Sequence, residues 1–405
     1  MSKPTVISLF TGAGGLDYGF EEAGFETVAA VEMNHDACET LRANRKWPVV
    51  ERDLTQLTTK ELLKIGGVRS GDVDVLIGGP PCQPFSKAGY WAHGDAKRLD
   101  DPRSNTLGAY LRVLEEAKPR VFLLENVEGL AFRGKDEGLR LLMDAFQKIN
   151  RRAGTKYRPV MKMLNAAEYG VPQLRKRVII VGSRDGTEFV FPQPTHGGQQ
   201  DLFQNLQPVM TAWSAIGDLT PDRHEDLAPT GRWADLLPSI PEGNNYLFHT
   251  DRGDGEELFG WRRHYWTFLL KLAKDLPSWT IQAQPGPAAG PFHWDNRRLS
   301  RRELCRLQTF PDNVEIKGTR VAAQRQIGNA VPSLLAEVLA RSIRTQLLGR
   351  RLVSALPKLL RPAASLTPAP RAPEPINPKY RALLGPHIAH PGTGLGNAAV
   401  QRSLF

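Results

Sequence analysis

The sequence predicts an α/β fold built on an open sheet, together with a smaller and irregular region. Two observations carry this prediction. Through Ser183, short apolar segments rich in β-branched residues alternate with segments whose apolar residues recur at helical spacing. From residue 186 to residue 295 this alternation is lost, and Gly, Pro and Trp are frequent. Chemistry is expected at the carboxyl ends of the strands, where open α/β sheets bind their ligands.

Length and composition fit an ordinary globular protein of two or three domains. The chain has 405 residues, of which 41% are hydrophobic and 24% are charged. It contains no apolar run of about 18 residues, so we expect no membrane span. The first four residues lead straight into an apolar strand, which argues against a signal peptide.

The cysteine content favours a reducing compartment. Cys38, Cys82 and Cys305 lie far apart, and no two cysteines are spaced as a C-x-x-C pair. A disulfide framework and a structural zinc site are both disfavoured, and we expect no metal. We therefore expect a protein of the cytoplasm.

The net charge favours a polyanionic partner, with nucleic acid as the first candidate. The formal charge is +10 and the pI is about 9.5. Residues 352–405 contain six basic residues against one acid, Glu374, so this tail carries half of the net charge. The body of the chain is therefore only moderately basic.

The first strand and its turn indicate a cofactor site. An apolar strand over Val6–Phe10 precedes the turn Thr11–Gly15, and helical spacing follows over Leu16–Gly24. Strand, glycine turn and helix together suit a nucleotide-type ligand, because glycine lets the backbone approach it closely. Asp17 stands where a dinucleotide fingerprint has its last glycine. This disfavours a nicotinamide cofactor and leaves room for another adenosine cofactor.

Acidic residues follow several of the predicted strands. The strand Thr27–Val31 ends in Glu32, about 20 residues past the glycines, where such folds place the carboxylate that binds ribose hydroxyls. Asp53 follows the next strand, and Glu125 follows a strand over Val121–Leu124. A ligand explains these positions well, although a solvated strand end or a helix cap explains Asp53 equally.

Cys82 comes shortly after the end of a predicted strand. The strand Val73–Ile77 ends in two glycines and two prolines, and the cysteine comes directly after them. On local sequence alone, a presented nucleophile and a small buried cysteine fit equally well. The polar stretch from Gln83 to Arg103 has no helical or strand period, and we interpret it as a lid over the site.

Further elements are predicted downstream. We expect helices over Ser104–Ala117, Leu139–Ile149 and Ser333–Leu348, and a terminal pair of strands over Pro159–Leu164 and Val178–Val181. Between these strands, Arg175 and Arg177 alternate on an extended segment, so both side chains should point the same way. Ser300 and Glu303 form a capping box, which predicts that a helix starts there. Residues 326–332 are expected to form a turn.

The irregular region and the tail call for different interpretations. Arg and aromatic residues interleave over Trp261–Trp266, which suits binding of nucleic acid by charge and stacking. An ordinary small core is the alternative, and some of these tryptophans must be core.

Residues 355–391 are rich in Pro and Ala without a period, so the tail is expected to be largely disordered and dispensable for activity.

Eight ordered segments carry a resemblance to a known family. They are Phe10 to Gly15, Glu32, Asp53, Gly79 to Gln83, Glu125 to Val127, Gln173 to Arg177, Arg298 to Pro311 and Gln326 to Pro332. In this order they resemble the DNA cytosine-5 methyltransferases of the bacterial restriction-modification type, over residues 5–183 and 297–345. The resemblance implies a Rossmann-like S-adenosylmethionine-dependent methyltransferase sheet with a smaller, irregular target-recognition domain.

The resemblance also implies domain boundaries and partners. Residues 1–185, completed by 297–350, would form the catalytic and cofactor-binding domain. Residues 186–296 would form the target-recognition domain, and 351–405 the basic tail. The cofactor would be S-adenosyl-L-methionine and the partner double-stranded DNA. We expect a monomer in the bacterial cytosol, associated with the nucleoid, that protects host DNA in a restriction or phage-defence system, with a cognate restriction endonuclease as its partner system.

The chemistry of cytosine methylation indicates roles for individual residues. Addition of a thiolate at C6 breaks the aromaticity of the ring and makes C5 nucleophilic, and Cys82 is the only cysteine presented on a suitable turn. Glu125 would protonate N3 as an acid with a raised pKa, and Asn126 would support the base edge. The resemblance implies that Arg175 contacts O2 of the cytosine and that Arg177 supports it. The base must leave the duplex for this reaction.

The resemblance extends to the residues around the cofactor and the DNA. Residues expected to bind the cofactor are Phe10, Gly12, Gly14, Gly15, Leu16, Glu32, Met33, Asp53, Leu54, Pro80, Asn329 and Val331. Residues expected to contact DNA are Gln83, Ser86, Arg103, Gln173, Arg262, Arg263 and Arg298.

Three other functions compete with this interpretation. A transfer-RNA cytosine methyltransferase shares nearly all these segments, but the long region 186–296, rich in Arg and Trp, favours a reader of duplex sequence. Intact Cys82, Glu125 and Arg175 argue against a catalytically inactive DNA-binding relative. The broken glycine fingerprint argues against a nicotinamide-dependent enzyme. A solitary methyltransferase without a restriction partner remains an alternative role.

Overall fold

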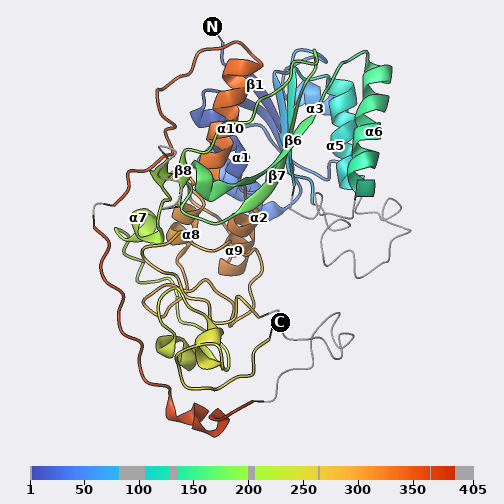
Figure 1. The fold of residues 1–405 in the computed structure, drawn as a ribbon. Helices are drawn as coiled ribbons and strands as arrows, with labels where there is room; N and C mark the ends of the chain where they lie inside the picture. The colour runs from blue at the N-terminus through green and yellow to red at the C-terminus, as the bar shows by residue number, and fades with distance from the viewer. Residues whose placement is uncertain are drawn as a thin grey trace.

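A computed structural model describes residues 2–81, 105–126, 136–198, 206–262, 265–364 and 366–387 of the chain (Figure 1). Cys82, the expected lid and the expected DNA contacts Gln83, Ser86, Arg103 and Arg263 lie outside the described residues, as does the side chain of Asn126. None of the helices within these ranges is both long and apolar enough to cross a bilayer.

A seven-stranded mixed sheet forms the centre of the larger half of the molecule, which confirms the predicted α/β class. In spatial order its strands are β3 (Val49–Glu51), β2 (Glu26–Glu32), β1 (Thr5–Leu9), β4 (Val75–Gly78), β5 (Val121–Asn126), β7 (Lys176–Ser183) and β6 (Val160–Asn165). The first five are parallel, and β7 runs antiparallel to both neighbours. The strand order reverses between β1 and β4, which is where open α/β sheets bind ligands.

Helices cover both faces of the sheet (Figure 1). One face carries α1 (Gly15–Glu22) and α10 (Ser333–Gln346), and the other carries α3 (Thr59–Ile65), α5 (Asn105–Ala117) and α6 (Asp136–Ala153). The strands are therefore buried on both sides, which explains why they read as continuous apolar runs. The sheet is completed from far along the chain, because α10 packs directly on α1.

Three further helices lie near the carboxyl ends of the strands. They are α2 (His35–Asn44), α8 (Arg301–Leu307) and α9 (Arg320–Asn329). The capping box at the start of α8 is present, since Glu303 N donates to Ser300 Oγ and Ser300 N donates to the Glu303 carboxylate. The expected turn over 326–332 is partly helical, because its first four residues form the last turn of α9.

Among the described residues between Ser183 and α8, the helices and strands are short. They are β8 (His196–Gly197), β9 (Gln207–Pro208), α7 (Ala212–Ile216), and the 3-10 helices η6 (Ala234–Ser239) and η7 (Tyr246–His249). The apolar side of α7 packs with α8 and α9 in a core that also includes Tyr18. Buried apolar residues from Leu236 to Leu269, with Phe292, form a separate core, and we call residues 233–292 the distal lobe.

The expectation of a largely disordered tail is wrong for residues 351–387. This segment is extended, ends in the 3-10 helix η8 (Pro378–Leu383), and buries Ile376 and Tyr380 in the core of the distal lobe. A Pro- and Ala-rich composition lacks helical or strand period, but it does not prevent an extended chain from being held by tertiary contacts.

Candidate active site

The carboxyl ends of β1, β4 and β5 lie side by side. In the parallel ladder Leu9 pairs with Gly78, and Gly78 pairs with Leu124. The residues one position further on, Phe10, Gly79 and Glu125, therefore emerge together at the same edge of the sheet. The glycine turn, the segment leading to Cys82 and the candidate acid are thus neighbours.

The glycine turn is joined directly to Glu32 at the end of β2. Gly12 N donates to one carboxylate oxygen of Glu32 at 2.8 Å, and the amides of Met33 and Asn34 donate to the other at 2.9 and 2.8 Å. Three of the roughly four lone-pair positions of this carboxylate are occupied by backbone donors. Glu32 is therefore fixed in orientation and retains acceptor capacity for a hydroxyl.

The turn itself leaves room for a ligand. Gly12 has φ +57°, in the left-handed region, and a Cβ there would meet no atom within 4 Å. Phe10 also has a left-handed φ of 54°, which is uncommon outside glycine and tends to occur at functional turns. A Cβ on Gly15 would lie 2.4 Å from the carbonyl oxygen of Val331. The segment after α9 therefore packs directly against the turn.

The remaining predicted cofactor residues differ in accessibility. Met33 and Asn329 are exposed, and Asp53 is half-buried with one carboxylate oxygen accepting from Thr55 N at 2.9 Å. Leu16, Leu54, Pro80 and Val331 are buried. The side chains of Leu54 and Val331 pack into the two cores that flank the sheet.

Asp17 is fully buried beneath the glycine turn. Ser8 Oγ donates to its carboxyl group at 3.0 Å, and Thr11 Oγ1 in turn donates to Ser8 Oγ at 3.1 Å. Burial raises the pKa of Asp17 from 3.8 to about 7. Asp17, which stands in place of the last glycine of the dinucleotide fingerprint, therefore supports the glycine turn through Ser8 and Thr11.

We predict that Asp17→Asn raises stability at alkaline pH. The native state holds a proton on Asp17 that the unfolded chain releases near pH 3.8, so stability is full below that pH and falls as pH rises towards 7. At pH 8 the variant should be more stable by up to about 4 kcal/mol, and near pH 4 the two proteins should differ little. Urea unfolding at both pH values measures this. An unchanged pH dependence in the variant would contradict the burial of a titrating carboxyl.

Glu125 is held by Arg177 beside the segment that leads to Cys82. Arg177 Nε lies 2.8 Å from Glu125 Oε1, and both side chains are largely buried. A Cβ on Gly79 would lie 2.7 Å from Glu125 Oε2, so the carboxylate occupies the space that a side chain at 79 would need. Burial raises the pKa of Glu125, although Arg177 and Arg175 oppose this rise.

Arg175 serves a different set of contacts from Arg177. Its side chain is completely buried, and it donates to the carbonyl oxygens of Ile281 at 3.2 Å and Gly328 at 2.7 Å. The two guanidinium groups therefore bind different partners, although both act on the charge of Glu125. Arg175 precedes the first residue of β7, so the alternation of that strand does not govern it.

A buried amide network joins three of the segments that carry the family resemblance. Gln173 Nε2 donates to Leu307 O and to Gln308 Oε1, both at 3.2 Å, and its Oε1 accepts from Ile281 N at 3.1 Å. Gln308 Nε2 then donates to Ile327 O at 2.6 Å. The expectation that Gln173 contacts DNA is corrected, because its side chain is fully buried and its amide is engaged on both sides.

Comparison with known proteins agrees with this geometry. A family model described as C-5 cytosine-specific DNA methylase matches residues 4–345. The chain belongs to this family. It is 40% identical over 371 residues to the type II methyltransferase M.SacI of Streptomyces achromogenes, covering 84% of this chain and 93% of that protein. It is 36% identical over 349 residues to the type II methyltransferase M.NgoFVII of Neisseria gonorrhoeae, covering 84% and 87%.

Solved structures share the fold of this C-5 cytosine methylase. The DNMT2 protein of Spodoptera frugiperda superposes with a TM-score of 0.57 at 17% identity, covering 84% of this chain and 99% of that chain. The methyltransferase EhMeth of Entamoeba histolytica gives 0.57 at 15% identity, covering 85% and 98%. The Rossmann-like fold class predicted from the sequence is therefore confirmed.

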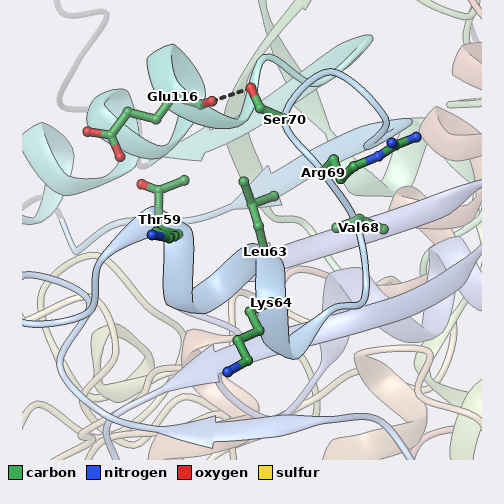
Figure 2. A pocket seen from close by; sticks show the side chains of 8 residues that line it. Thr59, Leu63, Lys64, Val68, Arg69, Ser70 and Glu116 are labelled. Carbon is green, nitrogen blue, oxygen red and sulfur yellow. Dashed lines mark hydrogen bonds between the residues drawn. The ribbon is translucent and has the colours of Figure 1, made fainter.

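One depression near the sheet of the methylase lies away from this edge. It has a volume of about 420 Å³ and is lined by residues of α3, by the segment before β4 and by Glu116 of α5 (Figure 2). Ser70 Oγ donates to Glu116 O at 2.6 Å across it. Because Ser70 precedes β4, this depression flanks the amino end of that strand, opposite to Gly79 and Glu125.

We predict that Gly79→Ala lowers methylation strongly with little loss of stability. The added methyl group meets the end of a side chain, so Glu125 can move away, but this movement breaks its contact with Arg177. The turnover number should fall about 100-fold, the usual range for a displaced acid–base group. Methyl transfer and thermal unfolding measure the two effects.

Gly78→Ala is the matched control for this prediction. Its Cβ would lie 2.7 Å from the backbone carbonyl of Leu9 in the neighbouring strand, which cannot move without disturbing the sheet. This variant should lose mainly stability. If Gly79→Ala is instead the more destabilised of the two, or retains full activity, the contact with Glu125 does not matter for catalysis.

Proposed function

We propose that the protein transfers a methyl group from S-adenosyl-L-methionine to C5 of a flipped-out cytosine within a specific double-stranded DNA sequence, through a covalent bond between Cys82 and C6. Membership of the C-5 cytosine methylase family supports the reaction class. The observation that carries the proposal is the Glu125 carboxyl, held by Arg177 against Gly79 and raised in pKa by burial. An acid is thereby fixed against Gly79, which lies three residues before the candidate nucleophile along the chain.

The residues at the sheet edge fit the proposed cofactor. The open turn at Gly12 accepts a ligand backbone, and Glu32 retains acceptor capacity for a ribose hydroxyl. Asp53 is accessible to an amine, and Met33 and Asn329 are exposed beside the turn. The cofactor would supply an electrophilic methyl group. The protein would hold it by the backbone of the turn and by the two carboxylates.

Glu125 would act as the acid towards N3 of the cytosine. Its raised pKa favours the protonated acid, and transfer of that proton to N3 would neutralise the charge that builds up on the ring as the Cys82 thiolate adds to C6. After methyl transfer the C5 proton leaves and the Cys82–C6 bond breaks, which restores the ring. Asn126, the last residue of β5, would support the base edge.

The two arginines would divide their roles differently from the expectation stated above. Arg177, which already contacts the Glu125 carboxyl, is better placed to approach the base than Arg175. Arg175 would position the site by joining β7 to Ile281 and to the end of α9. Removal of either charge would disturb Glu125, because both lower its pKa.

Charged and aromatic side chains beside the site would bind the duplex. Arg262 is exposed, while its backbone is fixed by two hydrogen bonds with the Tyr246 hydroxyl at 2.7 and 2.9 Å. Trp266 and Trp279 are exposed and pack edge to face, with ring centres 5.2 Å apart. Trp279 follows the segment that pairs with Gln173, so this aromatic pair adjoins the candidate site.

The named relatives favour a role in restriction and modification. Both are called type II methyltransferases, and the chain covers most of their length. We infer that the protein protects host DNA beside a cognate restriction endonuclease, as a monomer in the bacterial cytosol. A solitary methyltransferase with the same chemistry is the alternative role.

Methyl transfer to different nucleic acids tests the proposed function. Purified protein is supplied with methyl-labelled S-adenosylmethionine and either genomic duplex DNA or bulk transfer RNA. We expect label in DNA, and bisulfite sequencing of DNA from expressing cells should place it at C5 of cytosines within one short sequence. Label confined to transfer RNA, or none in either substrate, would overturn the proposal.

A further inference from the structure

We propose that residues 351–387 form a C-terminal strap that seats the distal lobe against the catalytic sheet and thereby sets the affinity for DNA. This inference rests on the proposed function. The strap lies beyond residues 4–345, the part that the family model matches, so it is additional to the shared methylase fold. Figure 1 shows it running from α10 along one side of the molecule to the distal lobe, where η8 lies.

The first part of the strap satisfies two buried charged side chains of α10. The carboxylate of Glu337 accepts the amides of Lys358 and Leu359 at 2.6 and 2.9 Å. Arg341 donates to the carbonyl oxygens of residues 354, 355 and 356 at 2.8–3.2 Å. Buried charges are costly unless they are hydrogen-bonded, so this end of the strap is fixed to the catalytic side.

The middle of the strap crosses towards the distal lobe through polar contacts. Arg361 forms an ion pair with Asp312, and the amide of Ala364 donates to a serine hydroxyl of α7 at 3.0 Å. Further along, the amide of Arg371 donates at 3.1 Å to Glu242, whose carboxylate also forms a buried ion pair with a lysine of the distal lobe.

The far end of the strap completes the core of the distal lobe. Ile376 and Tyr380 are buried there, although the lobe precedes them in the chain by more than eighty residues. The ring of Tyr380 stacks on Trp233 with centres 5.6 Å apart and planes 16° apart. The Tyr380 hydroxyl donates to Arg232 O at 2.9 Å. The lobe therefore depends on the strap for part of its packing.

A strap that is fixed at both ends restricts how the lobe sits relative to the sheet. The lobe carries Arg262, Trp266 and Trp279, the proposed DNA contacts, whereas the cofactor turn and Glu125 belong to the sheet. Loosening the far anchor should therefore weaken DNA binding before it disturbs chemistry at the sheet edge. Ile376 and Tyr380 are positioning residues in this account.

Ile376→Ala in the full-length protein tests the proposal, with Leu366→Ala as the matched control. Leu366 is in the same strap but is 79% exposed, so its loss should change nothing. The substrate is a duplex carrying the sequence mapped by bisulfite sequencing. We expect Ile376→Ala to raise KM for this duplex at least about tenfold, with kcat at saturating DNA and the Kd for S-adenosylmethionine within about twofold of the wild-type values. Hydrogen exchange should accelerate in residues 233–262 and not in β1, β4 or β5.

Each other outcome counts against the strap. Unchanged KM for the duplex, or loss of cofactor binding together with faster exchange throughout the sheet, would overturn it. If Ile376→Ala is insoluble, Ile376→Val is measured instead and should raise KM about threefold in the same selective pattern. Absence of methylation by the wild-type protein would refute the proposed function itself, which separates the two failures.

Discussion

Replacing Cys82 with serine should abolish methyl transfer while sequence-specific binding to duplex DNA persists. A serine hydroxyl is not ionised near neutral pH and lacks the nucleophilicity of a thiolate, so C6 of the cytosine would not be attacked. Methyl transfer from labelled S-adenosylmethionine measures the first effect, and electrophoretic mobility shift of the target duplex measures the second.

The other two cysteines provide the control for this experiment. Cys38 and Cys305 are buried, and burial raises the pKa of each thiol to about 12, so neither supplies a thiolate. Cys38→Ser should retain methylation. A near-normal rate in Cys82→Ser would show that the nucleophile has been assigned to the wrong residue.

Glu125→Gln should lower kcat about 1,000-fold without unfolding the protein, within the range expected for loss of general acid catalysis. Glutamine keeps the size of the side chain and an oxygen for Arg177, but it has no proton to deliver at the pH where the carboxylic acid would. Steady-state methylation and thermal unfolding together separate a catalytic effect from a structural one.

The pH dependence sharpens this second prediction. Since burial raises the pKa of Glu125, the wild-type acid loses its proton as pH rises through that raised value, and kcat should fall on the alkaline side. The fall should be absent in Glu125→Gln. Glu115→Gln on α5, a half-buried carboxyl away from the strand ends, is the control and should keep the wild-type profile. A retained alkaline fall in Glu125→Gln would assign the titration to another group.

Strand ends and caps could be predicted because they depend on residues close in sequence. The sequence predicts the glycine turn and Glu32 at the ends of two successive strands, and the structure joins them through the Gly12 amide. The capping box of α8 spans only Ser300 to Glu303. In both cases the local sequence contains all the partners of the interaction.

The errors concern contacts made far along the chain. Arg175 donates hydrogen bonds to the carbonyl oxygens of residues 281 and 328, which are more than one hundred positions away in the sequence. The residues near Arg175 in the sequence do not predict these contacts. Gln173 is buried by the same long-range packing. The ordered strap was not predicted because Ile376 and Tyr380 are two apolar residues in a Pro-rich segment that has no helical or strand period. Their role is seen only in the core of the distal lobe, which they complete.

Two features of the candidate site would have been hard to find without the fold. The absence of a side chain at Gly79 makes space for Glu125, yet in the sequence this glycine reads only as part of a strand stop. Asp17 reads as a broken fingerprint, whereas in the fold its buried carboxyl supports Ser8 under the glycine turn. Both follow from which strands are neighbours, which the sequence suggests but does not specify.

The covalent intermediate is the central claim, and trapping it is the most direct test. A target duplex carrying 5-fluorocytosine at the methylated position is incubated with the protein and S-adenosylmethionine, then separated under denaturing conditions. Because fluorine cannot leave as the C5 proton does, the Cys82–C6 bond should persist and the protein should migrate with the DNA. We expect a stable complex with the wild-type protein and none with Cys82→Ser. Active wild-type enzyme that gives no denaturant-resistant complex would contradict the proposed mechanism.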